Sequence, residues 1–306
     1  MQRYLISRLL QSMLLLIGVV VLVFFMVRLT GDPARLMVPR EATEEQVEAF
    51  RETMGFNRPL SVQFFDYFLG VFRGDLGDSL NFRQPSLKLI LERLPGTVQL
   101  AVTAMGFAIV VAIPLGIIGG TSPGSFVDSI GRSVGLLGQV IPNFWLALIL
   151  ILVFGVQLRW FPTFGRDSLA SVVLPSVALG LATMGQLVRL TRSAVLEIRN
   201  EDYIRTARSK GLTSLAIAAR HVFRNASIAL ISVIGVSFTY LLGGSVYIET
   251  IFSWPGLGNL LDQAIRARDF PLVQAIAIFI AGFAILMSLV TDIMYGVVDP
   301  RIRYGR

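Results

Sequence analysis

Six long apolar stretches dominate this sequence and limit the folds that are open to it. An α-helix needs about 20 apolar residues to cross a bilayer core of roughly 30 Å. Each of the six stretches reaches that length, and membrane helices tolerate the prolines and glycines inside them. We therefore expect an all-α integral membrane protein with six transmembrane helices, at Leu9–Leu29, Thr97–Gly119, Ser133–Val156, Val172–Ala194, Ser227–Ile248 and Leu272–Val297.

The composition supports a membrane protein. Only 15% of the 306 residues are charged, whereas soluble domains have about 25%. The absence of cysteine excludes disulfides and thiolate chemistry, and the single histidine, His221, excludes a histidine-rich metal site. The first apolar stretch could also be a cleavable signal peptide. The text after it, "FFMVRLTGDPARL", lacks the small residues of a cleavage site, so we expect a retained helix.

Arginine and lysine gather in the N-terminal tail, in the segment between the fourth and fifth stretches, and in the C-terminal tail. With six helices, all three segments lie on one side, and the positive-inside rule makes that side the cytoplasm. The net charge of +7 is then mostly an insertion signal and not a nucleic-acid-binding surface. The expected parts are a tail with the first helix (1–29), an external helical segment (30–96), a five-helix core (97–297) with a cytoplasmic loop (195–225) and an external re-entrant segment (249–271), and a cytoplasmic tail (298–306).

The external segment carries clear helix signals. In "TEEQVEAFRETMGF", Thr43 is the expected N-cap, Gln46 completes a capping box, and Gly55 ends the helix. The next stretch, "LSVQFFDYFLGVFRG", predicts a helix with an aromatic face for the membrane interface or the outer rim. A third, short amphipathic stretch, "PSLKLILERLP", precedes the second span. The segment is either a packed external cap or a surface for docking or substrate capture.

The phosphate-binding motif of ATPases is absent. The dipeptide Gly-Lys never occurs, so the chain has no phosphate-binding loop of the GxxxxGK[ST] type. We therefore expect no enzyme activity and no ATP hydrolysis by this chain. The spans are nearly free of ionisable groups, which argues against a proton relay. The main polar side chains inside them either line a polar path or hydrogen-bond between helices; they are Gln139, Asn143 and Gln186.

The stretch "RNEDYIRTARSKGL" predicts a short cytoplasmic helix within an otherwise apolar chain. Asn200 can cap its start, acidic residues occupy its first turn, and Gly211 provides a left-handed stop. Tyr203, Ile204 and Ala207 share one stripe that suits a partner's groove. The alternative is a solvated connector, but such a connector would not need caps at both ends.

These motifs resemble those of a known protein family. The chain resembles the inner-membrane permease subunits of bacterial ABC importers, in the dipeptide and oligopeptide group. "EDYIRTARSKG" is similar to that group's form of the cytoplasmic EAA loop, with Arg205 where the general motif has Glu. The stretches "GDPARL", "GDLGDSL", "ETIFSWPGLGNLL" and "DPRIRY" also resemble the group, and together they cover essentially the whole chain.

The resemblance implies a permease fold of the type I importer class in the bacterial cytoplasmic (inner) membrane, surrounded by lipid, with both termini in the cytoplasm. It implies a second, different permease chain, two cytoplasmic ATPases that use ATP and Mg²⁺, and an external binding protein, with no cofactor, metal or nucleic acid on this chain. It implies alternating access, driven through a coupling helix that consists of Glu201, Asp202, Tyr203, Ile204, Arg205, Thr206, Ala207, Arg208, Lys210 and Gly211.

The external stretch "WPGLG" is a second candidate site. It is either an aromatic anchor with a turn or a re-entrant gate formed by Trp254, Pro255, Gly256 and Gly258. The expected cargo is a dipeptide or oligopeptide, and the same importer type also carries glutathione or nickel complexes. The competing classes are a stand-alone secondary transporter or channel and a structural membrane scaffold. A coupling helix and spans poor in ionisable groups favour the importer.

Overall fold

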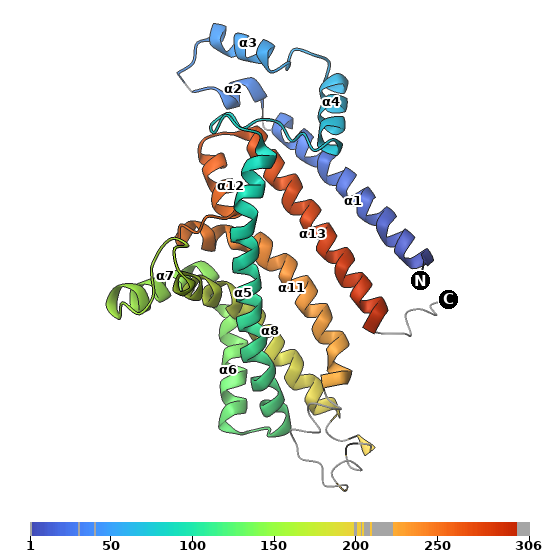
Figure 1. Cartoon of the computed structure of the whole chain (residues 1–306), viewed down its shortest axis with the longest axis vertical. Helices are drawn as coiled ribbons and strands as arrows, with labels where there is room; N and C mark the ends of the chain where they lie inside the picture. The colour runs from blue at the N-terminus through green and yellow to red at the C-terminus, as the bar shows by residue number, and fades with distance from the viewer. Residues whose placement is uncertain are drawn as a thin grey trace. The chain divides into compact units, whose positions relative to one another are not determined.

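The computed structural model describes residues 2–29, 31–39, 41–198, 201–202, 204, 209 and 223–298. These residues form helices and loops, and their only β-type pairing is an isolated bridge between Asp78 and Pro85. They divide into two compact units. The first unit consists of Thr97–Trp254 and the chain from Met287 onward, and the second consists of Gln2–Gly96 and Pro255–Leu286. Figure 1 shows the helices in chain order.

Four apolar helices in the described residues are each long enough to cross a membrane. They are α1 (Gln2–Leu29), α5 (Ser86–Thr121), α8 (Val173–Ile198) with the 3-10 turn Leu169–Val172 before it, and α13 (Phe270–Val298).

Two further candidate spans are bent helices. One pairs α6 (Phe126–Val140) with α7 (Asn143–Leu150) and the π-helix Ile151–Gln157, and the other is α11 (Phe223–Ile251), which bends by 46°. The fold is thus helical, with four to six candidate spans.

The third expected span is not a single helix. The chain turns by 110° between α6 and α7, and Ile141 at the turn is extended, with φ −80° and ψ 120°. Pro142 explains the break, because proline donates no backbone hydrogen bond and disfavours helical geometry in the residue before it. The stretch expected as the span Ser133–Val156 therefore consists of two helices and not of one.

The stretch "PSLKLILERLP" is also not a separate element. It is the first part of α5, which continues through Pro95. Packing on both sides of the proline compensates for the lost backbone hydrogen bond. Before it, Leu89 and Ile90 are buried against α12 (Leu257–Arg266) and the start of α13. After it, the Thr97 hydroxyl donates a 2.8 Å hydrogen bond to the buried Glu249 carboxylate.

The second unit contains three short helices between α1 and α5, namely α2 (Pro33–Met37), α3 (Glu44–Thr53) and α4 (Leu60–Phe72). The predicted capping box at the start of α3 is confirmed, since the Gln46 N–H donates to Thr43 and the Gln46 side chain accepts from the Thr43 N–H. Gly55 follows the helix with φ 69°, as its predicted role as a stop requires. Arg51 pairs with Asp32 at 2.5 Å, and this hydrogen bond raises the pKa of the guanidinium.

The aromatic face expected on α4 is split between two environments. Phe64 and Phe68 are half-buried and turn toward the rest of the second unit, whereas Phe65 and Phe72 are exposed.

A buried carboxylate ties the loop after α4 to the last helix. Asp269 has no exposed surface, and its carboxylate accepts from the Ser79 hydroxyl at 2.5 Å and the Asn81 N–H at 3.0 Å. The same carboxylate accepts from the Leu272 N–H at 3.3 Å, in the first turn of α13. We call this group of hydrogen bonds the Asp269 knot. The "GDLGDSL" stretch contributes Ser79 to this group.

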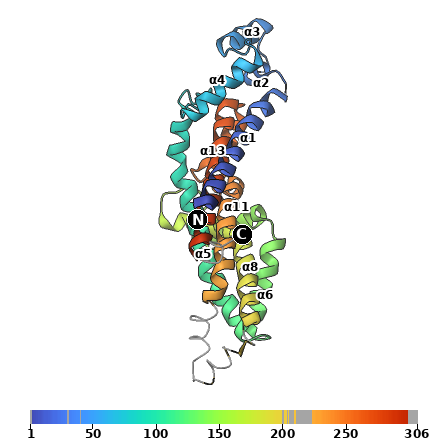
Figure 2. The same cartoon turned by 90° about the vertical axis from the view of Figure 1, so that its right-hand side faces the viewer.

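In the first unit, α8 packs closely against α6, and Figure 2 shows the two helices side by side. A Cβ on Gly138 of α6 would lie 2.6 Å from the Leu181 carbonyl oxygen of α8, so only glycine permits this approach. Gly135, where a Cβ would lie 3.1 Å from the Arg189 side chain, contributes to the same close contact. The Arg192 guanidinium of α8 donates to both oxygens of the buried Asp128 carboxylate on α6, at 2.6 and 3.2 Å. These contacts fix the position of the break after α6.

Candidate functional site

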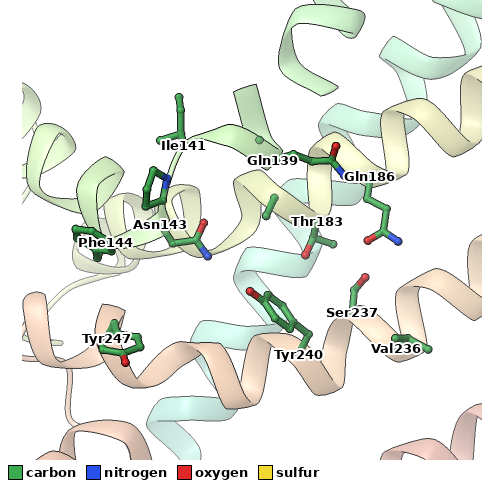
Figure 3. A pocket seen from close by; sticks show the side chains of 13 residues that line it. Gln139, Ile141, Asn143, Phe144, Thr183, Gln186, Val236, Ser237, Tyr240 and Tyr247 are labelled. Carbon is green, nitrogen blue, oxygen red and sulfur yellow. The ribbon is translucent and has the colours of Figure 1, made fainter. Parts of the chain in front are cut away.

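The first unit holds a cavity of about 780 Å³ at the break between α6 and α7. Its volume lies in the range of pockets that enclose small organic molecules. The lining comes from the end of α6, the break, the start of α7, and the facing sides of α8 and α11 (Figure 3). The lining residues are Gly138, Gln139, Ile141, Pro142, Asn143, Phe144, Ala182, Thr183, Gln186, Val236, Ser237, Tyr240 and Tyr247.

The helix break places two amide side chains at this cavity. Gln139 is in the last turn of α6, and Asn143 is the first residue of α7, directly after Pro142. In a continuous helix these two residues, four apart, would lie on one face. The 110° turn instead opens the backbone between them and leaves room for a cavity.

The opposite walls contribute hydroxyl and amide groups at helical spacing. Thr183 and Gln186 are three residues apart on α8, and Ser237 and Tyr240 are three apart on α11. Figure 3 shows these side chains projecting into the space between the two helices. Tyr247, seven residues after Tyr240, continues the same side of α11.

The polar side chains of the cavity have no hydrogen-bond partners among the described residues. None of the thirteen lining residues carries a formal charge. Among the residues that the structure describes, no hydrogen bond joins the side chains of Gln139, Asn143, Thr183, Gln186, Ser237 or Tyr240 to a protein group. Their donors and acceptors are therefore available to water or a solute. The cavity can hydrogen-bond a polar molecule without an ionic contact.

The cavity brings together the polar residues of the apolar spans. Gln139, Asn143 and Gln186 all line it, and among the described residues no hydrogen bond joins their side chains to another helix. The sequence reasoning missed Thr183, Ser237 and Tyr240. Their signal was the spacing of three to four residues from each other or from Gln186, which places polar groups on one side of an apolar helix.

The candidate external gate begins in a buried turn. Trp254 has no exposed surface, its N–H donates to the Glu249 carbonyl at 2.7 Å, and the Arg166 guanidinium lies 5.8 Å from its ring centroid. Arg166 in turn donates to the Gln99 side chain at 2.7 Å. Trp254 is therefore an aromatic side chain held inside the chain at a turn.

The other gate residues belong to the second unit. Pro255 carries a carbonyl oxygen that Gly96 approaches too closely for any residue with a Cβ. Gly256 precedes α12 as its N-cap, and Gly258 is buried in the first turn of that helix.

Three of the ten candidate coupling residues fall within the described part of the chain. Glu201 and Asp202 are exposed, and the Ile204 N–H donates to the Glu201 carbonyl at 3.0 Å. Ile204 is buried at 1% exposure, so in this structure its side chain is not offered to a partner. The remaining residues lie outside the described residues; they are Tyr203, Arg205, Thr206, Ala207, Arg208, Lys210 and Gly211.

Comparison with known families decides the class of the molecule. Residues 112–304 match the model of the binding-protein-dependent transport system inner membrane component, and residues 1–101 match that of the N-terminal part of the same kind of membrane component. The chain belongs to this family of importer permeases. The cavity at the α6–α7 break thus lies in a transport protein.

Two curated relatives match the permease over nearly its whole length. A peptide transport system permease protein of Brucella abortus (strain 2308) is 40% identical over 313 residues, which cover 99% of this chain and 100% of the relative. The glutathione transport system permease protein GsiC of Salmonella choleraesuis (strain SC-B67) is 38% identical over 305 residues, with coverage of 99% and 100%.

A solved structure matches the fold. The inward-facing MetNI methionine ABC transporter aligns with a TM-score of 0.55 and 20% identity over 70% of this chain and 97% of that chain. Together with the family, this likeness makes the protein a multi-pass inner-membrane permease of an ABC importer. It is not an enzyme, because the ATPase activity of such importers resides in partner subunits.

Proposed function

We propose that this permease forms half of the translocation path for dipeptides, oligopeptides or similar small peptides, and that the cavity at the α6–α7 break is part of that path. The observation that carries the proposal is the chemistry of the cavity. Its amide and hydroxyl groups are uncharged and have no partner in the described part of the chain. A peptide backbone presents matching N–H and C=O groups, which need hydrogen-bond partners once they leave water. The name of the Brucella relative supports the same cargo.

Glutathione is a second candidate cargo, because the GsiC relative carries that substrate in its name. Glutathione also presents peptide N–H and C=O groups, so the same cavity chemistry serves it.

The path requires a second permease chain, different from this one, because this chain supplies one half of the path. Two ATPases on the cytoplasmic side bind ATP and Mg²⁺, and an external binding protein delivers the cargo. Both termini of this chain lie in the cytoplasm. The expected division into a first helix (1–29), an external segment (30–96), a core (97–297) and a tail (298–306) belongs to this proposal.

Energy enters through the cytoplasmic segment from Glu201 to Gly211. Closure of the ATPases moves this segment, and the spans rock between inward-facing and outward-facing states. On the external side, the turn from Trp254 to Gly258 acts as the gate. The buried ring of Trp254 and its contact with Arg166 support a defined closed position of the first part of this turn.

Reconstituted transport tests the cargo. The complete complex and its binding protein are placed in liposomes, and uptake of radiolabelled trialanine and of radiolabelled glutathione is measured with and without ATP. ATP-dependent accumulation of either one supports the proposal and names the cargo. Uptake by this chain alone, without ATPases, would instead support a stand-alone channel or secondary transporter.

Coupling is tested with Gly211→Trp, since a bulky residue at the expected left-handed stop should distort the end of the coupling helix. We expect less ATPase retained on the purified permeases, or ATP hydrolysis that no longer drives uptake. Gly106→Ala on α5, where a Cβ meets no atom within 4 Å, is the control. Normal coupled uptake by the Gly211→Trp complex would contradict the assigned role.

A further inference from the structure

Helix α4 has two apolar faces, and among the described residues only one of them packs against other parts of the chain. Its exposed side chains Val62, Phe65, Leu69 and Phe72 recur at intervals of three and four residues, which places them in one stripe. Their exposed fractions are 41%, 61%, 48% and 49%. A short helix that is apolar on both sides is unusual in water, since a surface helix normally has a polar outer face.

The covered face packs along α1 in the opposite chain direction. Near the end of α1, the Arg28 guanidinium donates to the Gln63 side chain at 2.8 Å. One turn earlier on α1 and at the next position on α4, the rings of Phe24 and Phe64 meet edge to face with centroids 5.2 Å apart.

The contacts then continue toward the middle of α1. Tyr67, Phe68 and Val71 of α4 pack against the cluster that Val20 and Val23 form with Ile278 of α13. As α4 proceeds from Gln63 to Val71, its contacts therefore move from Arg28 to the cluster of Val20, Val23 and Ile278.

These contacts set the depth of α4 along a membrane span. The apolar part of α1 runs from Ile6 to Leu29. Val20 is eight residues before Arg28, which is about 12 Å along a helix axis. The apolar layer of a bilayer is about 30 Å thick. The second half of α4 therefore lies beside a part of α1 that is well inside its apolar length.

The exposed stripe is also continuous with the outer surface of α1. Leu22, Phe25 and Met26 of α1 are exposed, at 58%, 37% and 59%. Phe25 stacks on Phe64 with centroids 6.1 Å apart, and Phe64 in turn contacts Phe65 of the stripe. The surface that α1 turns to lipid thus passes without a polar boundary onto α4.

The charges around α4 agree with this placement. The only carboxylate or basic side chain within Leu60–Phe72 is Asp66, and it pairs with Arg58 at 3.2 Å. Arg58 lies before the start of the helix, at the same end as Arg28 and Gln63. Arg73 follows the last residue and is exposed, so its long side chain can reach the headgroups while its stem lies along apolar atoms.

We propose that α4 is a membrane-embedded interfacial helix, and that the stripe Val62, Phe65, Leu69 and Phe72 lies among lipid acyl chains at the Arg28 end of α1. The occupant of the stripe is lipid and not a protein partner. The helix anchors the segment between α1 and α5 to the bilayer surface, in the manner of amphipathic interfacial helices. The proposal depends on α1 crossing the membrane and does not depend on the cargo.

The chain has no cysteine, so a single introduced cysteine is its one labelling site, once any cysteines of the partner subunits have been replaced. We would label Leu69→Cys and Phe72→Cys in the complete complex, in phosphatidylethanolamine and phosphatidylglycerol liposomes. Met26→Cys on α1 is the lipid reference, and Glu48→Cys on α3, with a half-exposed side chain, is the water reference. Collision of each label with oxygen and with a water-soluble nickel chelate is then measured by electron paramagnetic resonance.

The stripe labels are expected to behave like Met26, with strong relaxation by oxygen and loss of the nickel effect that Glu48 shows. Nickel relaxation at Leu69 and Phe72 equal to that at Glu48 would place the stripe in water and overturn the proposal. Immobile labels that neither reagent reaches would mean that a protein covers the stripe, which overturns it equally. A melting temperature unchanged from the unlabelled complex verifies that each variant is folded.

Discussion

Two groups of polar residues in this permease show opposite uses of polarity in an apolar chain. In the Asp269 knot, one buried carboxylate accepts hydrogen bonds from Ser79, Asn81 and Leu272. In the cavity, the amides of Gln139 and Gln186 have no partner among the described residues. A satisfied polar group stabilises the fold, whereas an unsatisfied one is available to a solute. The comparison predicts that substitutions in the knot change stability and that substitutions in the cavity change transport.

The largest effect is expected for Asp269→Ala. The substitution leaves the Ser79 hydroxyl and the Asn81 N–H without their buried acceptor and removes the cap of α13. We expect the free energy of unfolding to fall by about 3 kcal/mol. The free energy of unfolding is measured by adding increasing amounts of dodecyl sulfate to the protein in mixed detergent micelles. Asp78→Ala in the same loop is the matched control, because that residue is exposed. A similar loss of unfolding free energy in this control would mean that the Asp269 knot does not stabilise the fold.

Gly138→Ala tests whether the cavity depends on the close approach of α6 and α8. The added Cβ would lie 2.6 Å from the Leu181 carbonyl oxygen, so the helices must separate. We expect a loss of about 2 kcal/mol in unfolding free energy, together with reduced uptake, because the separation displaces Gln139. Gly106→Ala should instead leave stability unchanged or slightly higher, since its Cβ meets no atom within 4 Å. Equal behaviour of the two variants would refute the packing argument.

Gln186→Leu tests whether the polar groups of the cavity serve transport and not stability. The amide is exposed and has no hydrogen-bond partner within the described chain, so its removal leaves no buried group unsatisfied. We expect stability within about 0.5 kcal/mol of the parent and a fall of about fivefold in ATP-driven uptake, the equivalent of one hydrogen bond to cargo. Gln186→Asn, which keeps the amide, should restore part of the uptake. Unchanged uptake by the leucine variant would remove Gln186 from the path.

The smallest effect is expected for Thr43→Ala in the capping box of α3. Its hydroxyl is satisfied, like the groups of the knot, but Thr43 is exposed. Water can therefore replace the lost bond, and we expect a cost of only about 0.5 to 1 kcal/mol with normal uptake. Amide hydrogen exchange in α3 measures the effect locally. A loss of stability as large as that of Asp269→Ala would mean that burial does not explain the difference between the exposed Thr43 and the buried Asp269.

The sequence predicted most reliably those features that depend on neighbouring residues. The capping box of Thr43 and Gln46 and the stop at Gly55 are local, and both are confirmed. Two prolines show where local reasoning ends. Pro95 lies inside a continuous helix, whereas Pro142 stands at a 110° turn. Nothing in the adjacent residues separates the two cases, because the outcome depends on the helices that pack on either side.

The same limit applies to the candidate sites. Gln139, Asn143 and Gln186 could be selected because an amide is conspicuous in an apolar span, and they do share a cavity. Ser237 and Tyr240 became part of it only through the position of α11, which residue spacing suggests but does not fix. Asp269 before "FPL" is a readable helix cap. Its partner Ser79 is 190 residues away in the sequence and could not have been inferred.

That separation has a consequence for biosynthesis. A ribosome that adds about 5 to 20 residues per second needs about 10 to 40 s to travel from Ser79 to Asp269. During that interval the loop after α4 has been made, but the acceptor of its hydrogen bonds does not yet exist. The segment between α1 and α5 can therefore reach its final form only after the start of α13 has been made.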